Sequence, residues 1–540
     1  WSERWIVDPE VLGSTPSPGT IVQICATGVL PGGDGGSVCF YGANAPGISG
    51  RNEAMEKIEP QTLKGFQDLL PGDMIARAAV IETVRRVYER YGFLPIETPI
   101  IERMDILTGT AGGDTNKQIF ELSTPEEEPA ALRFDLTVPF ARLISQYREE
   151  MKLPFRRYAM GPVFRADKPG PGRFRQFTQL DIDIAGADTL AADAEIIAVM
   201  CDAMRALGLG ARTAEDGSRV RPVFEMRISN RRLVDALLEG NGITAPETIK
   251  QVLRVMDKLQ KVGIESVRAE LGPGRVDESG APIAGVQLSP DLIDRITAFV
   301  AVSAPSRAEL LKALEAQLPR NEQSAQALDE MAELARYLDA LGVAEDEAPY
   351  DPSLTRGLDY YTGPVYEIGL PAAPEFGSVG GGGRYDELCT RFMEERVPAT
   401  GASIGVDRLI AALASLGIVK KPKTNVQVSI ATVGKVPREE VFRLAAELRD
   451  LGFNTLTYLG GKKSMSAQLS DADRYVIPVA VILGEDELAN GLVSVKDLIA
   501  GKAIREGIID REAYRNAGRQ TQVTVPRAEM EAAIRNMLDA

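Results

Sequence analysis

A helical spacing of apolar residues is the first regular pattern along the chain. From Asp73, apolar side chains recur three or four positions apart, and Gly92 follows, as glycine often does at a helix end. The apolar positions of this face are Ile75, Ala78, Ala79, Val84, Val87, Tyr88 and Tyr91. Residues 189–207 return to this spacing, and residues 229–345 keep it over most of their length. These segments are predicted to be helical.

Alternation of apolar and polar residues takes over between the helical segments. It marks residues 130–140, 155–166 and 175–186, and strand-like patterns resume over 358–370 and 402–413. A period of two indicates antiparallel strands with one lined face. Because strand-like segments lie on both sides of the helical stretch, we predict one α+β domain on a mostly antiparallel sheet, interrupted by a helical insertion.

The same patterns give the domain boundaries. The sheet domain comprises residues 55–228 and 346–419, and the helical insertion comprises residues 229–345. A linker at residues 420–424 leads to residues 425–540, whose β-α-β-α-β pattern predicts a small α/β domain with a mostly parallel sheet.

The first part of the chain differs from the rest. Residues 1–54 are rich in Gly, Pro and Ser and show little periodicity. Ordered patterning begins only after Met55. We therefore expect residues 1–54 to be a disordered or artefactual leader.

Composition narrows the class of protein. Of the 540 residues, 44% are apolar and 26% are charged, which is typical of a globular protein. No apolar run approaches the ~20 residues of a transmembrane helix, so we expect no membrane contact. The four cysteines are far apart and form no C-x-x-C pair, which argues against a disulfide framework or a zinc site and fits a reducing cytoplasm.

The chain contains no histidine. Imidazole-based zinc sites, Ser-His-Asp chemistry and any histidine general base are therefore excluded, and no metal site built from histidine or cysteine is expected. A reaction at this protein has to use carboxylates, arginines, backbone groups or the substrate itself.

One stretch opposes the charge of the whole molecule. Residues 155–177 hold five arginines and one lysine against a single acid, Asp167, whereas the chain has a net charge of −16. With the Gly-Pro-Gly turn at its centre, this stretch is predicted to form a hairpin with arginines near its open end. The hairpin is either a solvated basic surface or a phosphate site, since guanidinium forms bidentate bonds to phosphate. Gln179, Asp181 and Asp183 follow at a spacing of two and share a face, which suggests a substrate with both a cation and a carboxylate or phosphate.

A glycine-dense segment, GSVGGGGRYDEL, occupies residues 377–388. It matches neither a P-loop nor a dinucleotide-binding fingerprint. Its position between strand-like segments leaves two interpretations, a flexible linker or a close approach of the backbone to a ligand.

Five motifs in order resemble a known family. FRRYAMGPVFRADKPGPGRFRQFTQLDIDIAG resembles motif 2 of class II aminoacyl-tRNA synthetases, and YGFLPIETPIIE (91–102) and GASIGVDRLIAAL (401–413) resemble motifs 1 and 3. RGLDYYTGPVYE (356–367) and SVGGGGRYDEL (378–388) are similar to the two signatures of the histidyl-tRNA synthetase family. The tail resembles the anticodon-binding domain of several class II synthetases, so the resemblance covers residues 57–540.

The resemblance implies ATP-dependent ligation of L-histidine to its cognate tRNA through a histidyl-adenylate. Arg165 matches the arginine on the α-phosphate, Arg408 the arginine on the γ-phosphate, and Arg356 a catalytic arginine near the carboxylate and α-phosphate. Arg173 would join Arg165 and Arg408 in binding ATP, with Mg²⁺ as the implied metal.

The resemblance also assigns the histidine pocket. Asp135, Thr137 and Gln179 match positions that hold the substrate ammonium. Asp183 and Tyr361 match positions that read the imidazole, and Tyr360 and Tyr385 would line the same pocket. An apolar analogue would leave such buried acceptors without hydrogen bonds, and its binding is therefore disfavoured.

The implied partners are tRNA and a second copy of the chain. Motif 1 builds a homodimer interface in the family, and lysines at positions 420, 421, 423, 462 and 463 lie near or in the predicted anticodon-binding domain. An alternative is a non-catalytic, synthetase-like regulatory subunit of ATP phosphoribosyltransferase in histidine biosynthesis. Such subunits generally lack the C-terminal domain. A synthetase for threonine, proline or glycine would share the tail but not the two histidine signatures.

Overall fold

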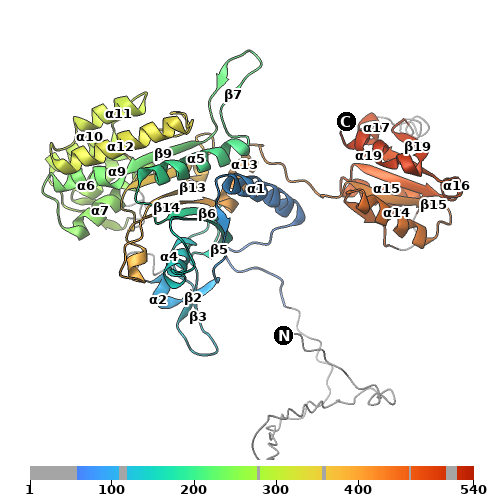
Figure 1. Cartoon of the computed structure of the whole chain (residues 1–540), viewed down its shortest axis with the longest axis horizontal. Coiled ribbons are helices and arrows are strands. Elements are labelled where there is room, and N and C mark those ends of the chain that lie inside the picture. Colours follow the sequence, from blue (N-terminus) through green and yellow to red (C-terminus); the bar gives the residue numbers. More distant parts are fainter. Residues whose placement is uncertain are drawn as a thin grey trace, which may run out of the picture. The chain divides into compact units, whose positions relative to one another are not determined.

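A computed structural model of the chain describes residues 58–108, 118–276, 280–355, 360–460, 464–505 and 520–539 (Figure 1). The predicted leader and Met55 lie outside the described residues. A large domain built on one sheet is followed in sequence by a smaller domain with a sheet of its own.

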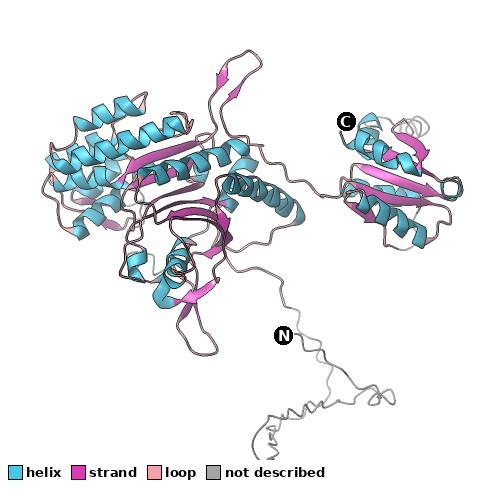
Figure 2. Cartoon of the chain, viewed as in Figure 1, coloured by secondary structure: helices cyan, strands magenta, loops and turns pink. Residues whose placement is uncertain are grey.

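A seven-stranded sheet forms the centre of the large domain (Figure 2). Its strand order is β1-β5-β6-β14-β13-β12-β9. The strands are β1 (Leu94–Pro95), β5 (Phe155–Phe164), β6 (Gln176–Ala185), β9 (Glu225–Asn230), β12 (Pro364–Gly369), β13 (Gly380–Arg384) and β14 (Ala399–Gly405). Only the pair β1 and β5 is parallel, and all other neighbours in this sheet are antiparallel. The predicted mostly antiparallel sheet is confirmed.

The basic stretch forms the predicted hairpin. β5 and β6 pair over their full length, from Phe155 opposite Ala185 to Phe164 opposite Gln176. The turn between them contains Gly172 at φ +60°, a conformation that favours glycine.

Two segments predicted from alternation contain helices. Within 130–140, only β4 (Ala130–Leu132) is a strand, and α4 (Thr137–Gln146) begins soon after it. The cause is Asp135, whose Oδ1 accepts hydrogen bonds from the backbone N–H groups of Thr137 at 3.1 Å and Val138 at 2.9 Å, partners that a helix N-terminus otherwise lacks. In the same way, 402–413 begins as β14 but continues as α13 (Val406–Ser415).

Three helices cover one face of the sheet. α5 (Leu190–Ala206) contacts β6 and β14, α13 contacts β6, and α1 (Pro71–Arg90) contacts both α5 and α13. The predicted helix at the start is confirmed, but its face is rotated: Ala78 and Ala79 are exposed. The buried positions of α1 are Ala76, Arg77, Val80, Val84, Val87 and Tyr88.

The helical insertion lies in sequence between two strands that pair with each other. β9 precedes it and β12 follows it, and the two pair antiparallel in the sheet. Its helices are α6 (Arg231–Glu239), α7 (Pro246–Met256), α8 (Leu259–Val262), α9 (Ile264–Leu271), α10 (Pro290–Val300), α11 (Arg307–Glu315) and α12 (Glu322–Ala340). A small hairpin, β10 (Gly274–Val276) with β11 (Pro282–Ala284), interrupts them. The sheet is thus continuous across the insertion.

Short elements complete the large domain. A three-stranded sheet has the order β2-β4-β3, and a separate hairpin joins β7 to β8. Their bounds are β2 (Ile101–Arg103), α2 (Met104–Leu107), β3 (Glu121–Leu122), β7 (Arg212–Thr213), β8 (Arg219–Val220), and the 3₁₀ turns η2 (Pro374–Phe376) and η3 (Cys389–Arg391).

The smaller domain has a mixed sheet of order β16-β15-β17-β18-β19. The two pairings of β15 are parallel, but β17–β18 and β18–β19 are antiparallel, so the prediction of a mostly parallel sheet is wrong for half of the pairings. The reason is the short α16 (Glu485–Ala489) between β17 and β18, since a parallel crossover needs a dozen or more residues. The remaining elements are β15 (Val428–Val433), α14 (Arg438–Asp450), β16 (Thr455–Thr457), α15 (Met465–Arg474), β17 (Val479–Gly484), β18 (Leu492–Asp497), α17 (Leu498–Arg505), β19 (Gln522–Pro526), η4 (Arg527–Glu529) and α19 (Met530–Leu538).

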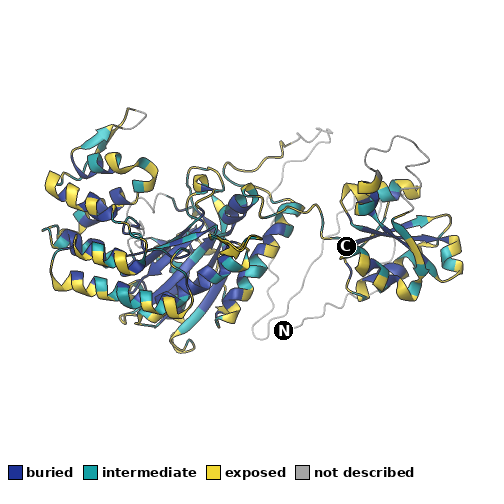
Figure 3. Cartoon of the chain, turned by 90° about the horizontal axis from the view of Figure 1, so that it is seen from above, coloured by how far each residue is buried: buried dark blue, intermediate teal, exposed yellow. Residues whose placement is uncertain are grey.

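Burial follows the two sheets. Figure 3 shows buried residues along the strands and exposed residues on the outer faces of the helices. The large domain and the smaller one have separate apolar clusters. Among the described residues, no helix is both long and apolar enough to cross a membrane.

Candidate active site

The large domain contains a pocket on the face of the seven-stranded sheet opposite the helices α5 and α13. Along β6, Leu180, Ile182 and Ile184 belong to the apolar core, so the residues that alternate with them point to the opposite face. Those residues are Gln179, Asp181 and Asp183, as the spacing of two predicted.

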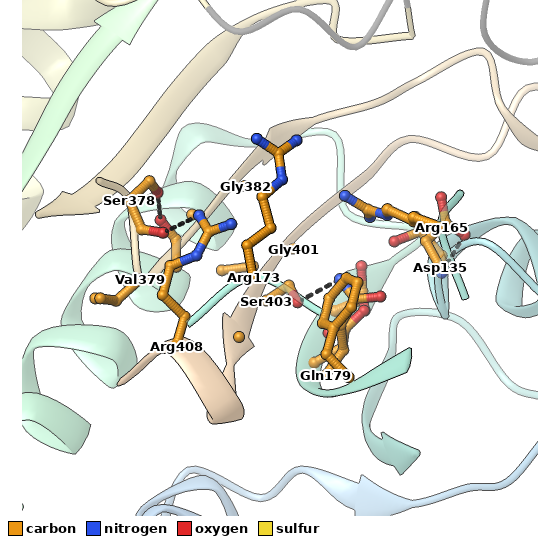
Figure 4. A pocket seen from close by; sticks show the side chains of 18 of the residues that line it. Asp135, Arg165, Arg173, Gln179, Ser378, Val379, Gly382, Gly401, Ser403 and Arg408 are labelled. Atoms are coloured by element: carbon orange, nitrogen blue, oxygen red, sulfur yellow. Dashed lines mark hydrogen bonds between the residues drawn. The ribbon is translucent and has the colours of Figure 1, made fainter. Parts of the chain in front are cut away.

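Most of the predicted site residues line this one pocket. They are Asp135, Thr137, Arg165, Arg173, Gln179, Asp183, Tyr360, Tyr361, Tyr385 and Arg408. Figure 4 shows Arg408 and Arg173 on one side and Arg165 with Asp135 on the other. Arg356 lies outside the described residues.

Asp183 is held from two sides at the floor of the pocket. Its Oδ2 lies 2.6 Å from Nη2 of Arg157, and its Oδ1 accepts a hydrogen bond from the hydroxyl of Tyr385. Arg157 is fully buried and stacks over Phe140, with 4.5 Å between the guanidinium carbon and the ring centre. Burial raises the pKa of Asp183 to about 7, although Arg157 opposes the shift.

Tyrosine rings wall the pocket beside Asp183. The ring of Tyr360 meets that of Tyr361 edge-on at 5.0 Å and that of Tyr385 at 6.0 Å. Tyr361 and Tyr385 are buried in an apolar cluster with Phe140. This corner combines an apolar surface with a carboxylate and can take a flat, polar-edged ring.

Asp135 lies just before helix α4 and lines the pocket. One carboxylate oxygen, Oδ1, is occupied by the backbone N–H groups of Thr137 and Val138. Burial raises the pKa of Asp135, and its two hydrogen bonds and Arg165 only partly oppose the shift. The cap therefore fixes the orientation of the carboxylate beside the pocket.

Gln179 and Asp181 carry buried acceptors that lack well-formed hydrogen bonds. Nε2 of Gln179 donates to Oγ of Ser403 at 2.8 Å, which holds the amide in one orientation. Oε1 of Gln179 and both carboxylate oxygens of Asp181 have no well-formed hydrogen bond among the described residues. Burial raises the pKa of Asp181 to about 6, and Arg157 and the Ser403 hydroxyl lower it only in part.

The other end of the pocket gathers guanidinium groups. Arg165 lies over the rings of Phe134 at 4.2 Å and Phe177 at 5.3 Å, and its Nε donates to the Phe134 carbonyl. Nη1 of Arg408 donates to the carbonyl of Ser378 at 2.7 Å. Burial lowers the pKa of Arg408, and the nearby cations Arg173 and Arg165 lower it further. Cations that repel one another in a partly buried site favour a polyanionic ligand.

The glycine-dense segment is a buried strand and not a linker. β13 consists of four glycines and Arg384, and all five are buried. A Cβ on Gly382 would lie 1.9 Å from the carbonyl oxygen of Gly401, and one on Gly383 would lie 2.7 Å from the ring of Tyr361. The glycines let β13 lie against β14 and Tyr361, so the interpretation as a flexible linker is wrong, and a close approach of this backbone to a ligand stays a prediction.

Some residues of the site had no predicted role. Arg157 lies in the basic stretch, but only the register of the hairpin places it opposite Asp183. Ser403 faces Asp181 across β6 and β14 through a pairing between segments far apart in sequence. Asp181 itself was placed on the correct face by its spacing, without a function.

An antiparallel sheet that carries guanidinium groups and buried carboxylates in one pocket, together with a separate α/β domain, is the arrangement that the resemblance to class II aminoacyl-tRNA synthetases led us to expect. Residues 65–409 match the sequence family described as histidyl-tRNA synthetase, and residues 427–537 match the anticodon binding domain. The chain belongs to the histidyl-tRNA synthetase family.

Curated relatives agree over nearly the whole chain. A histidine–tRNA ligase of Paracoccus denitrificans is 40% identical over 495 residues, covering 88% of this chain and 97% of the relative. One of Rhizobium meliloti is also 40% identical, covering 90% and 97%. The crystal structure of histidyl-tRNA synthetase from Nostoc sp. is similar with a TM-score of 0.72 and 32% identity, covering 89% of this chain and 100% of that one.

A further structural neighbour is more distant in sequence. An ATP phosphoribosyltransferase regulatory subunit/histidyl-tRNA synthetase from Bacillus halodurans has a TM-score of 0.63 at 22% identity, covering 79% of this chain. At that identity the likeness shows the fold alone.

Proposed function

We propose that this chain ligates L-histidine to its cognate tRNA at the expense of ATP, through a histidyl-adenylate. The observation that carries the proposal is the pocket itself, in a member of this family. Guanidinium groups gather at one end, and buried carboxylates with tyrosines gather at the other. These two ends suit a triphosphate and a cationic amino acid with a polar ring.

At the histidine end, Asp135, Thr137 and Gln179 bind the ammonium group. Asp183 accepts a hydrogen bond from the imidazole, and its orientation is fixed by Arg157 and Tyr385. Tyr360, Tyr361 and Tyr385 line the ring site. Because Asp183 is buried, an apolar ring would leave its carboxylate without a donor, and this penalty supplies specificity.

At the nucleotide end, the arginines position the triphosphate. The histidine carboxylate attacks the α-phosphorus, the bond to the bridging oxygen breaks, and pyrophosphate leaves. No base is needed, because the carboxylate is already ionised. Arg165 stabilises the charge that develops on the α-phosphate, Arg408 binds the γ-phosphate, and Arg173 adds a contact to ATP. The family resemblance adds Arg356 near the carboxylate and α-phosphate.

Mg²⁺ enters with ATP. Among the described residues, no group of three or more acids and cysteines is arranged to hold a metal ion. The phosphate oxygens of ATP would provide the principal ligands of the ion. The ion would neutralise part of the triphosphate charge beside the arginines.

The transfer step joins the activated histidine to tRNA. The smaller domain, which matches the anticodon binding domain, binds the anticodon. Lys420, Lys421 and Lys423 precede it in sequence, and Lys421 pairs with Asp73 at 2.6 Å. Lys462 and Lys463 lie outside the described residues. The enzyme acts as a cytoplasmic homodimer, and residues 55–228 with 346–419 form its catalytic domain.

Pyrophosphate–ATP exchange that depends on histidine tests the proposal. The wild-type protein exchanges label with histidine and not with threonine, proline or glycine. The variants Arg165→Ala and Arg408→Ala lower the exchange rate by about 10²–10³-fold, the usual effect of removing one group that stabilises transition-state charge. Arg86→Ala is the matched control, because the side chain of Arg86 is 73% exposed on α1 and, among the described residues, forms its ion pair with Glu82.

The same assay separates the alternative. A regulatory subunit of ATP phosphoribosyltransferase would fold normally but form no adenylate. Absence of histidine-dependent exchange in the folded wild-type protein would overturn the proposed function.

A further inference from the structure

Asp181 lies at the centre of the pocket face without an assigned role. Its side chain is 1% exposed, and neither carboxylate oxygen has a well-formed hydrogen bond among the described residues. Its partner in the register on β5 is Ala159, which has no polar side-chain atom, and its partner on β14 is Ser403. A buried carboxylate without donors is costly. The cost is explained if a ligand supplies the donors.

The unpartnered acceptors are adjacent. Gln179 lies two positions before Asp181 on the same strand face and is 8% exposed. Its Nε2 is occupied by Ser403, so its Oε1 remains as a free acceptor among the described groups. Three oxygens of these two residues therefore lack a well-formed hydrogen bond among the described residues, and both residues line the pocket.

An ammonium group matches this set. It carries three N–H donors and no acceptor, whereas a neutral imidazole carries one donor and one acceptor. Asp183, the acid proposed to accept from the imidazole, already contacts Arg157 and Tyr385. Beside Asp181 lies the hydroxyl of Ser403, which forms no well-formed hydrogen bond with it and leaves its acceptors available. We propose that Asp181 binds the α-ammonium of the amino-acid substrate together with Gln179. This assignment rests on the proposed function and adds a residue to its ammonium site.

The charges of the pocket support the assignment. Asp135 lies close enough to raise the pKa of Asp181, after the larger effect of burial. The carboxyl groups of the pocket thus repel one another, and an ammonium group relieves this repulsion when it binds. Binding should lower the pKa of Asp181 and release a proton near pH 6.

Asp181→Asn removes the charge with little change in shape. In the histidine-dependent exchange assay, the KM for histidine should rise about 10- to 100-fold, as for loss of a charged hydrogen bond, while the KM for ATP stays unchanged. Calorimetry with two probes locates the lost contact. L-Histidinol keeps the ammonium and should lose a similar factor in affinity. 3-(Imidazol-4-yl)propanoate lacks the amino group and should bind wild type and variant equally.

Thermal unfolding separates this role from a structural one. A carboxyl whose pKa is raised on folding destabilises the folded state above the pKa of the unfolded chain. Asp181→Asn should therefore raise Tm at pH 7.5, by an amount that shrinks as the pH falls from 6 to 4. A structural role for Asp181 would instead lower Tm.

Each result decides the proposal. An unchanged histidine KM, or an equal loss of affinity for the analogue without an amino group, overturns the role of Asp181 while exchange by the wild type still upholds the enzyme. If Asp181→Asn does not fold, the proposal is tested on the wild-type protein alone. Histidine binding at pH 6 then releases protons to the buffer and the analogue without an amino group releases fewer, and equal release by both overturns the proposal.

Discussion

The pair Arg157–Asp183 shows how strongly single residues are coupled in this site. Both side chains are almost completely buried, and the two atoms of the pair lie 2.6 Å apart. Burying two charges is expensive, and their attraction and hydrogen bonds roughly offset that expense. Removing one partner leaves the other charge buried and uncompensated, so the pair is needed for the shape of the pocket more than for net stability.

Arg157→Met should lower the free energy of unfolding by about 3–5 kcal/mol at pH 8. The loss should be smaller at pH 5, because Asp183, with a pKa near 7, is then largely protonated in the folded wild type. Urea unfolding of the wild type and the variant at the two pH values measures this loss of free energy.

A double variant and a control complete this test. Arg157→Met with Asp183→Asn should recover part of the loss, because no unpaired charge remains. Arg86→Met breaks an exposed ion pair with Glu82 and should leave stability unchanged. An equal loss at pH 5 and pH 8 would show that packing, and not charge, holds Arg157 in place.

At the scale of elements, the pocket depends on glycines that keep neighbouring strands free of side chains. Gly401 on β14 faces Asp183 on β6, and a Cβ at position 401 would lie 1.9 Å from Oδ1 of Asp183. That oxygen is the acceptor for Tyr385. The glycine thus leaves the space in which the carboxylate lies.

Gly401→Ala should displace Asp183 and raise the KM for histidine by about 10- to 100-fold, within the usual cost of overpacking a core. Histidine-dependent exchange measures it. Gly369→Ala at the end of β12 is the control, because a Cβ there meets nothing within 4 Å, and it should leave the KM unchanged. A normal KM in Gly401→Ala would mean that Asp183 is free to move without loss of function.

Local patterns predicted some elements well and others poorly. The hairpin of β5 and β6 and the helix α5 follow directly from period and turn residues, because their pairing is local in sequence. The start of α4 was missed, since the capping of its first N–H groups by Asp135 outweighs the alternation around it. The pairing of β6 with β14 joins residues more than 200 positions apart, and no local signal contains it.

The same limit applies to the site. Chemical type and spacing were sufficient to place Gln179, Asp181 and Asp183 on one face. The register of the hairpin gives Asp183 its partner Arg157, and Tyr385, more than 200 positions away, donates a hydrogen bond to it, so the contrast between Asp183 and Asp181 was not predictable from the sequence.

For the whole molecule, the distribution of charge determines how the KM values for tRNA and for histidine depend on salt. The net charge is −16, so the protein as a whole repels tRNA. Contact with phosphates has to come from local exposed cations, such as Lys168 in the basic hairpin and Lys420 and Lys423 before the smaller domain. Binding through such contacts releases counterions and weakens as salt rises. Histidine is recognised by buried groups that salt screens little.

Aminoacylation and amino-acid activation should therefore differ in their salt dependence. Between about 50 and 200 mM NaCl, the KM for tRNA should rise by roughly 10-fold or more, because several phosphate contacts are lost together. The KM for histidine in the exchange assay should change by less than about twofold, since its contacts lie inside the pocket. Parallel titrations on one preparation provide the control, and an equal response of both constants would show that tRNA is bound chiefly through uncharged contacts.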